Sequence, residues 1–352
     1  MLEPFIEPIP TRESCWRSIV IMGKNSATYK FALAASLIEL SAGGADFISL
    51  EELAVPFSRN LREHLKHSGK QSTRNDIPSL IEACNQSNNG EIDEQSLIET
   101  TVKLGFNNVI DAFHVIGRKG DTNEGNTPLR FFHDDRKSRG GITLTDDFFY
   151  LAEGNQFASL PHEVQARWNL VETAWELGIA SNVIDIEYDL DGGLLYILRK
   201  DTARTDVTSC RDALNGYQKG RCFYCFIDIS VESGSDSLAQ VDHFLPHILK
   251  RVRQITNLDG VWNLVLACRN CNSRKSDTPP KVEFLTRLNT RNNYLISSRH
   301  PLRETLINQT GDTRARRHSF LNKSYQSAVA TRISTWGPIE EFGTTFSVNP
   351  ET

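Results

Sequence analysis

Long hydrophobic runs are missing from this chain of 352 residues, in which no apolar stretch approaches the roughly 18–20 residues that span a bilayer. The first ten residues hold two glutamates and three prolines, unlike a secretory signal. Internal repeats and low-complexity tails are also absent. These absences argue against a membrane partner, and we expect an intracellular, cytoplasmic protein.

Methionine and cysteine are scarce, with two and seven residues. The hydrophobic content of 39% and the charged content of 24% are ordinary for a soluble globular protein, and the length suffices for two or three domains. Four of the seven cysteines lie in two closely spaced pairs. The other three, Cys15, Cys84 and Cys210, stand alone, and single thiols in a reducing compartment are usually buried in a core.

The net charge of the chain is −5, but the charged residues are distributed unevenly along it. Residues 249–323 carry 15 lysines and arginines against 5 acids, whereas residues 1–248 carry 23 against 36. The basic segment suits a polyanion such as nucleic acid, although a solvated surface with chance clustering would look the same. The acidic first part suggests that it docks on a protein partner, associates with itself or restrains the rest of the chain.

Hydrophobic periodicity predicts that the first half is mostly helical. Residues 29–40 have apolar positions at helical spacing, and Ser49 with Glu52 forms a capping box that opens a helix to about His67. We expect a loop over residues 85–92. Further helices are predicted over residues 75–84, 94–104, 107–116 and 163–177.

Two β-hairpins are expected to interrupt the helices, one over residues 129–145 and one over residues 182–200. The polar residues 201–209 are the best candidate for a linker. Residues 281–335 are predicted to be helical again, with breaks near residues 298–301 and 310–313.

The two cysteine pairs are Cys222-Phe223-Tyr224-Cys225 and Cys268-Arg269-Asn270-Cys271. This spacing can supply four thiolates to one tetrahedral zinc ion. The alternative is a pair of redox dithiols, which usually sit at a helix start in a β-α-β context that is not visible here. A four-thiolate site is closed to substrate, so we expect a structural zinc that ties two distant segments together.

Between the pairs, Asp242 stands next to His243, and Asn272 follows the last cysteine directly. Residues 263–268 are typical of a buried strand, and Trp262 is expected in the core. The pattern Cys-x-x-Cys, Asp-His-x-x-Pro, a central asparagine at Asn263, and Cys-x-x-Cys-Asn resembles the HNH endonuclease family, also called ββα-metal or His-Me finger nucleases. The resemblance covers about 60 of the 352 residues.

The resemblance implies a role for each residue. His243 would be the general base, Asp242 and Asn272 would hold one catalytic Mg²⁺ or Mn²⁺, and Asn263 would brace the loop. Asn272 fills a position where the family often has histidine. The chemistry agrees, because a hard cation on oxygen ligands neutralises a phosphodiester, and an imidazole with a pKa near ~6.5 can take a proton from water.

Four nearby side chains are candidates for nucleic-acid contacts, and each also has an interpretation that involves no ligand. Arg269, Arg274 and Lys275 would grip the backbone, or are simply solvated. His247 would contact phosphate, or is an ordinary loop histidine.

Elsewhere the signals are weak. His64 and His67, three residues apart on a helix, are read as surface residues. Gly23-Lys24-Asn25-Ser26 resembles a phosphate loop superficially but lacks the Gly-x-x-x-x-Gly-Lys spacing. The acidic residues at 185, 187, 189 and 191 fit a hairpin with one solvated face better than a second metal site.

We therefore expect an α+β protein in three parts. Residues 1–205 would form a mostly helical recognition or regulatory domain with β-hairpins, 206–280 a zinc-stapled HNH module, and 281–352 a basic helical extension. The resemblance implies an enzyme that hydrolyses DNA to 5′-phosphate and 3′-hydroxyl ends, in bacterial antiviral defence or restriction. The alternatives are a catalytically silent nucleic-acid-binding or adaptor protein, and a nuclease that acts on RNA or branched DNA.

Overall fold

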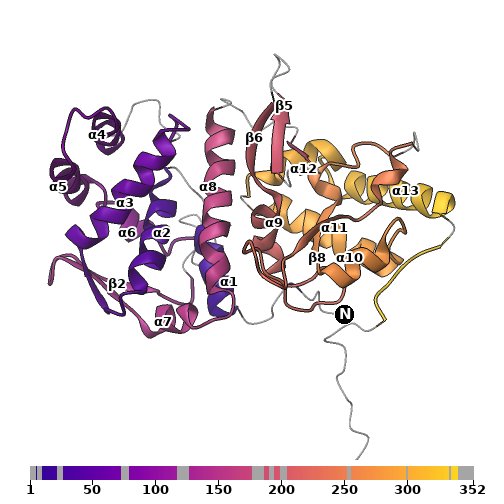
Figure 1. Ribbon diagram of the computed structural model, residues 1–352, viewed down its shortest axis with the longest axis horizontal. Coiled ribbons are helices and arrows are strands. Elements are labelled where there is room, and N and C mark those ends of the chain that lie inside the picture. Colours follow the sequence, from indigo (N-terminus) through magenta and orange to yellow (C-terminus); the bar gives the residue numbers. More distant parts are fainter. Residues whose placement is uncertain are drawn as a thin grey trace, which may run out of the picture. The chain divides into compact units, whose positions relative to one another are not determined.

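The described part of the chain forms two compact units, shown as ribbons in Figure 1. Helices predominate over three small antiparallel sheets, so the predicted α+β class is confirmed. None of the helices in this part is both long and apolar enough to cross a membrane. The computed structural model describes residues 5, 10–21, 27–72, 79–116, 127–176, 186–189, 194–198, 204–251, 255–298, 300–332 and 334–339.

The N-terminal unit, residues 8–180 with 299–301, packs helices around one small sheet. The sheet has the strand order β1-β3-β2 with antiparallel pairing throughout, and β2 with β3 is the hairpin expected over residues 129–145. The elements of this unit are α1 (Arg12–Val20), α2 (Tyr29–Ser41), β1 (Phe47–Ser49), α3 (Leu50–Leu65), α4 (Ser79–Asn88), α5 (Glu94–Leu104), α6 (Val109–Ala112), β2 (Phe132–Asp135), β3 (Gly141–Leu144), α7 (Asp146–Ala152), η1 (Phe157–Ser159) and α8 (Leu160–Glu176).

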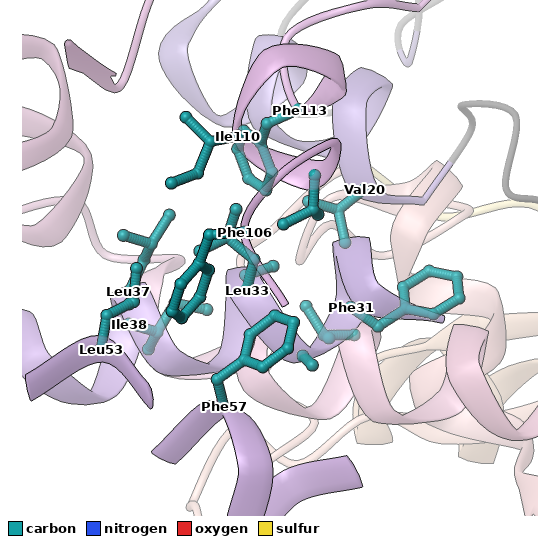
Figure 2. Packing of buried hydrophobic residues seen from close by; sticks show 14 of the residues in the cluster. Val20, Phe31, Leu33, Leu37, Ile38, Leu53, Phe57, Phe106, Ile110 and Phe113 are labelled. Atoms are coloured by element: carbon teal, nitrogen blue, oxygen red, sulfur yellow. The ribbon is translucent and has the colours of Figure 1, made fainter. Parts of the chain in front are cut away.

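Helix α2 is the centre of the N-terminal core. It is apolar around most of its circumference, as expected of a helix with neighbours on all sides, and it packs against α1, α3, α6, α7 and α8. Figure 2 shows Leu33 and Leu37 of α2 in one cluster with Phe57 of α3 and with Phe106. Burial of this cluster, and not helix propensity alone, stabilises the helices of the unit.

The start of α3 confirms the predicted capping box. The Ser49 hydroxyl accepts a hydrogen bond from the Glu52 backbone N–H at 3.1 Å, and the Glu52 carboxylate accepts one from the Ser49 backbone N–H at 2.8 Å. Both donors would otherwise be unpaired at the helix terminus. These contacts lower the pKa of the Glu52 carboxyl.

His64, which the sequence analysis places on the surface, is buried, so that prediction is wrong. Its Nδ1 lies 2.8 Å from the nearer carboxylate oxygen of Glu172, and its ring stacks on Trp168 with centroids 3.6 Å apart. The Gln71 amide donates to the same carboxylate over 2.5 Å. Helix α8 supplies Glu172 and Trp168 from about a hundred residues away, which helical spacing on α3 does not reveal. His67 is exposed, as predicted.

Two further boundaries differ from the sequence analysis. Helix α4 continues to Asn88, through residues expected in a loop, because the Asn88 side chain exchanges two hydrogen bonds of 3.0 Å with Arg62 of α3. The helix predicted over residues 107–116 is only the four residues of α6. Contacts with α3 therefore set the end of α4.

The cysteine-bearing unit comprises residues 1–7, 181–298 and 302–352. Helices α11–α13 confirm the predicted helical segment with its two breaks, and they belong to the same compact unit as the cysteines. Its elements are β4 (Ile186–Tyr188), β5 (Leu194–Leu198), β6 (Arg204–Ser209), α9 (Cys210–Gln218), β7 (Gln240–His243), η2 (His247–Arg251), η3 (Val261–Asn263), β8 (Leu264–Ala267), α10 (Arg269–Lys275), α11 (Val282–Ser297), α12 (Leu302–Thr310) and α13 (Arg314–Arg332).

Strand β6 occupies residues that the sequence analysis assigned to a linker. It pairs antiparallel with β5, which pairs with β4, so the two strands within the predicted hairpin over residues 182–200 belong to a three-stranded sheet. The linker prediction is wrong for residues 204–209, and the boundary expected after residue 205 falls inside this strand. Pairing with β5 satisfies the backbone of a segment whose polar side chains had suggested a loop. The turn expected at residues 191–193 lies outside the described residues.

Candidate functional site

The four paired cysteines lie together, as predicted. Their sulfur atoms are all within 4.8 Å of one another, and Sγ of Cys225 lies 3.8 Å from Sγ of Cys268. Zinc–sulfur bonds of ~2.3 Å in a tetrahedron place the sulfurs about 3.8 Å apart, so the cluster fits a zinc ion. Backbone N–H groups of Cys268 and Cys271 donate to sulfurs of the cluster at 3.3 and 3.4 Å. The three single cysteines are buried, as expected of core thiols.

The fold connects the first cysteine pair to the strand that leads into the second. The Phe223 backbone N–H donates to the Leu266 carbonyl of β8 over 2.9 Å. The Gln218 side chain, at the end of α9, donates to the same carbonyl and accepts from the Leu266 N–H, each over 2.8 Å. This amide pairs with the open edge of β8 as a third strand would. The two pairs are therefore aligned by β8 as well as by any ion between them.

The segment between the pairs forms a β-β-α unit. Strands β7 and β8 are antiparallel, with Asp242 opposite Val265 and His243 opposite Leu264, and α10 follows β8 directly. Cys268 is the N-cap of α10, and its sulfur accepts the N–H of Cys271 in the first turn. The last residue of β7 is His243, so the imidazole stands where the strand turns into a loop.

Asn263 braces this loop with its side chain. Its Oδ1 accepts the Leu245 N–H at 2.8 Å, and its Nδ2 donates to the carbonyls of Leu245 and Leu258 at 3.0 and 2.8 Å. The side chain is fully buried, so each of these bonds replaces water that could not reach the groups. Trp262, beside it, is buried in the core, as expected.

The imidazole of His243 is paired with Asp259, a residue that the sequence analysis missed. Nε2 of His243 lies 3.1 Å from Oδ1 of Asp259, and Nε2 of His247 lies 3.6 Å from the same oxygen. Lys250 forms an ion pair with the other oxygen. Burial by itself raises the pKa of Asp259, but hydrogen bonds from His243 and Lys250 outweigh it and bring the pKa to about 2. Asp259 is therefore ionised at neutral pH.

Asp242 is held by two donors on buried groups. Oδ2 accepts the Tyr224 hydroxyl at 2.5 Å, and Oδ1 accepts the Lys275 ammonium at 3.0 Å. Lys275 also donates to the backbone carbonyl of His243 at 2.7 Å. Burial and the charge of Asp242 raise the pKa of Tyr224 well above its ordinary value, so the hydroxyl keeps its proton. Tyr224 lies between the first two cysteines, which links the candidate zinc site to Asp242.

Asn272 and Asp242 are on the side of β7 that faces α10. The Asn272 side-chain amide donates to Gln240 over 2.7 Å, and Gln240 lies two residues before Asp242 on the same face of the strand. His243, the next residue along, pairs with Asp259 instead. The contacts thus separate the predicted cation ligands, Asp242 and Asn272, which lie between β7 and α10, from the predicted base His243, which pairs with Asp259.

The candidate nucleic-acid contacts differ in their access to solvent. Arg269 and Arg274 are exposed on α10, and His247 is partly exposed in η2. Lys275 is fully buried against Asp242, so its ammonium is not accessible to a phosphate group of a nucleic acid. Its position indicates that it stabilises the Asp242 carboxylate.

The donor types at Asp242 and Asn272 suit a hard cation. Each carboxylate oxygen of Asp242 accepts one hydrogen bond and has a second lone pair, and the Asn272 amide oxygen is a neutral ligand of the kind that Mg²⁺ takes. The Lys275 ammonium already balances the charge of the carboxylate. A cation at this position would therefore compete with Lys275 for Asp242.

Comparisons with known protein families, with curated proteins and with solved structures found no match to this chain.

Proposed function

We propose that the chain is a metal-dependent endonuclease that hydrolyses phosphodiester bonds of DNA. The observation that carries the proposal is the placement of His243 at the end of β7. There it is paired with the ionised Asp259, in a loop braced by Asn263, beside a four-cysteine cluster that fits zinc. An imidazole with a carboxylate partner at a strand end is the arrangement that a general base needs.

In this proposal His243 accepts a proton from the water that attacks the phosphorus atom. The ring becomes positively charged, and the Asp259 carboxylate at 3.1 Å stabilises that charge. Lys250, which forms an ion pair with Asp259, keeps the cluster from carrying an excess of negative charge toward an anionic substrate. Asp259 is therefore proposed as a positioning residue for the base.

Asp242 and Asn272 are proposed to hold one Mg²⁺ or Mn²⁺, which, when bound, neutralises the phosphate and stabilises the leaving 3′ oxygen. The Tyr224 hydroxyl fixes the orientation of the Asp242 carboxylate, and a bound cation would share that carboxylate with Lys275. Arg269 and Arg274, on the exposed face of α10, are proposed to bind the phosphates of the strand. The products would carry 5′-phosphate and 3′-hydroxyl ends.

The zinc proposed for the cysteine cluster has a structural role. Four thiolates leave no coordination position for water or substrate. The ion would hold Tyr224 against Asp242 and the start of α10 against β7, and so would support the residues that bind the substrate.

The proposal is tested by incubating zinc-loaded protein with supercoiled plasmid in Mg²⁺ or Mn²⁺. We expect nicking that is lost in His243→Ala and retained in His162→Ala, a matched substitution of an exposed histidine on α8. One active site cuts one strand, so nicked circles should form before linear DNA. Equal cleavage by both variants would refute the role of His243. Cleavage of RNA or branched DNA alone, or of neither, would favour the alternative substrates or the silent module.

A further inference from the structure

A cavity lies in the cysteine-bearing unit, away from the residues discussed above. It is an open cleft of about 630 Å³ between α11 and α13. Asn289, Asn293 and Tyr294 line it from α11, and Arg314 and His318 line it from α13. None of the side chains that form this cleft is acidic. The cleft therefore offers positive charge beside the partly exposed ring of Tyr294, which packs on Tyr217 with ring centroids 5.3 Å apart.

Arg314 gives the cleft its clearest charge. The first turn of α13 contains several basic residues and no acid, although the dipole of a helix disfavours positive charge at its N-terminus. Arg316 is neutralised by Asp312 at 3.1 Å, and Arg317 is buried in hydrogen bonds. Arg314, in contrast, makes no ion pair with an acid of the described chain. Its charge is unfavourable at the N-terminus of the helix, and an anion bound in the cleft would offset that cost.

The walls of the cleft are held in place by hydrogen bonds within and between the two helices. Nε of Arg317 donates to Oδ1 of Asn293 over 2.8 Å, and Nδ2 of Asn293 donates to the Asn289 carbonyl over 2.9 Å. The Arg317 bond joins α13 to α11 directly. A preformed site of this kind loses little entropy when a ligand binds.

Both helices are also attached to the segment that carries Asn263. Arg291 and Asn292 of α11 donate to the Trp262 carbonyl over 3.0 and 3.2 Å. The Trp262 ring packs edge-on against Phe320 of α13, with centroids 5.0 Å apart. The cleft and the loop of His243 are therefore parts of one rigid arrangement, and a strand bound in the cleft would be positioned relative to the candidate base.

We propose that the α11–α13 cleft binds a single strand of nucleic acid, with a base stacked on Tyr294 and phosphates held by Arg314 and His318. An aromatic ring beside positive charge in a groove is the combination that binds single strands, whereas contacts to a duplex backbone need no stacking surface. The inference depends on the proposed function for the identity of the strand, which would be the substrate or the strand displaced from it.

The test measures the affinity of the full zinc-loaded chain for a labelled single-stranded oligonucleotide by fluorescence anisotropy, in a His243→Ala background that prevents cleavage. Tyr294→Ala should weaken binding by about 5- to 140-fold, the measured range for loss of one stacked base, and Tyr294→Phe should bind like the parent. Arg314→Ala should reduce the slope of log affinity against log salt concentration by about 0.7.

Lys323→Ala is the matched control. Lys323 is an exposed cation of the same helix, nine residues after Arg314, and two and a half turns place it on the opposite face. Lys323→Ala should leave the affinity and the salt slope nearly unchanged, because it removes only a charge that lies far from the cleft. Circular dichroism and thermal melting of each variant exclude loss of the fold as the cause.

The outcomes separate this inference from the proposed function. If the parent binds the oligonucleotide and the Tyr294 and Arg314 variants bind equally well, the cleft is not the binding site, even if the chain cleaves DNA. If those variants lose affinity but the native chain cleaves nothing, the cleft inference holds and the nuclease proposal fails. Absence of binding by the parent, or tighter binding to a duplex of the same sequence, overturns the inference.

Discussion

The hydrogen bond from Tyr224 to Asp242 allows a direct test of how the first cysteine pair supports the candidate site. Tyr224→Phe removes only the hydroxyl, which donates to Asp242 over 2.5 Å. It keeps the ring, which packs edge-on against Phe284 and Trp336 with centroids 5.4 and 5.2 Å away. Because the residue is fully buried, water is not expected to replace the missing donor. The substitution therefore isolates one bond to a buried carboxylate.

The expected magnitude follows from the charge of the acceptor. A hydrogen bond to a charged group contributes about 1.5–3 kcal/mol to the free energy of unfolding. Asp242 keeps the Lys275 ammonium at 3.0 Å, so the carboxylate is not left unpaired. We therefore expect a loss near the lower end, about 1.5–2 kcal/mol. For a unit of this size that corresponds to a fall of about 3–8 °C in melting temperature.

Tyr325→Phe is the control for this experiment. The Tyr325 hydroxyl donates to the neutral carbonyl of Pro280 over 2.8 Å, in the same unit and also buried, so its loss should cost about 0.5–1.5 kcal/mol. Both variants are unfolded with urea in the zinc-loaded state. A loss for Tyr224→Phe no larger than that for Tyr325→Phe would refute the reasoning. Under the proposed function, only Tyr224→Phe should also raise the Mn²⁺ concentration needed for half-maximal cleavage.

Three further predictions use other parts of the structure. Metal analysis should find one zinc per chain, and removal of the ion with a chelator, or Cys271→Ser, should melt the cysteine-bearing unit at lower temperature, because zinc binding is coupled to folding. The pKa of Asp259 is lowered from 3.8 to about 2, so its ion pairs stabilise the fold fully above pH ~4, and this stabilisation is lost as the pH falls from there through the folded-state pKa of about 2. Asp259→Asn should remove about 1–2 kcal/mol of this acid dependence, measured by urea unfolding between neutral pH and pH 2, and an unchanged pH profile would contradict it. Glu172→Ala should cost about 2–6 kcal/mol by leaving His64 and Gln71 buried without their acceptor, whereas Glu39→Ala, which breaks an exposed pair, should cost less than about 1 kcal/mol.

Local signals predicted much of the fold. The capping box at Ser49, the apolar residues at helical spacing in α2 and the breaks between α11, α12 and α13 were all visible in the sequence. Each depends on residues within one or two helical turns, which is the range over which propensity and capping act. Errors arose where a distant partner changed the outcome. Strand β6 forms because it can pair with the free edge of β5, and α4 is longer than predicted because Arg62 of α3 binds its last residue.

The candidate site shows the same division. The Cys-x-x-Cys spacing predicted the cluster of four sulfurs, because two cysteines three positions apart already share one turn and only one long-range contact is needed. Asp259 was missed. It is followed by a glycine and lies four residues before Asn263, so its position in the loop next to the predicted site could have marked it as a candidate. Lys275 was read as a surface cation, since the sequence does not show that it is enclosed beside Asp242.

The types of ligand, the spacing of the cysteines and the helix termini could thus be derived from the amino-acid sequence, because they depend on neighbours along the chain. Only the tertiary structure paired His243 with Asp259, Tyr224 with Asp242, and His64 with Glu172. Each of these pairs joins residues from different elements, sixteen or more positions apart, and no periodicity relates them. Burial then decides their strength, because the same groups in water would exchange partners with solvent.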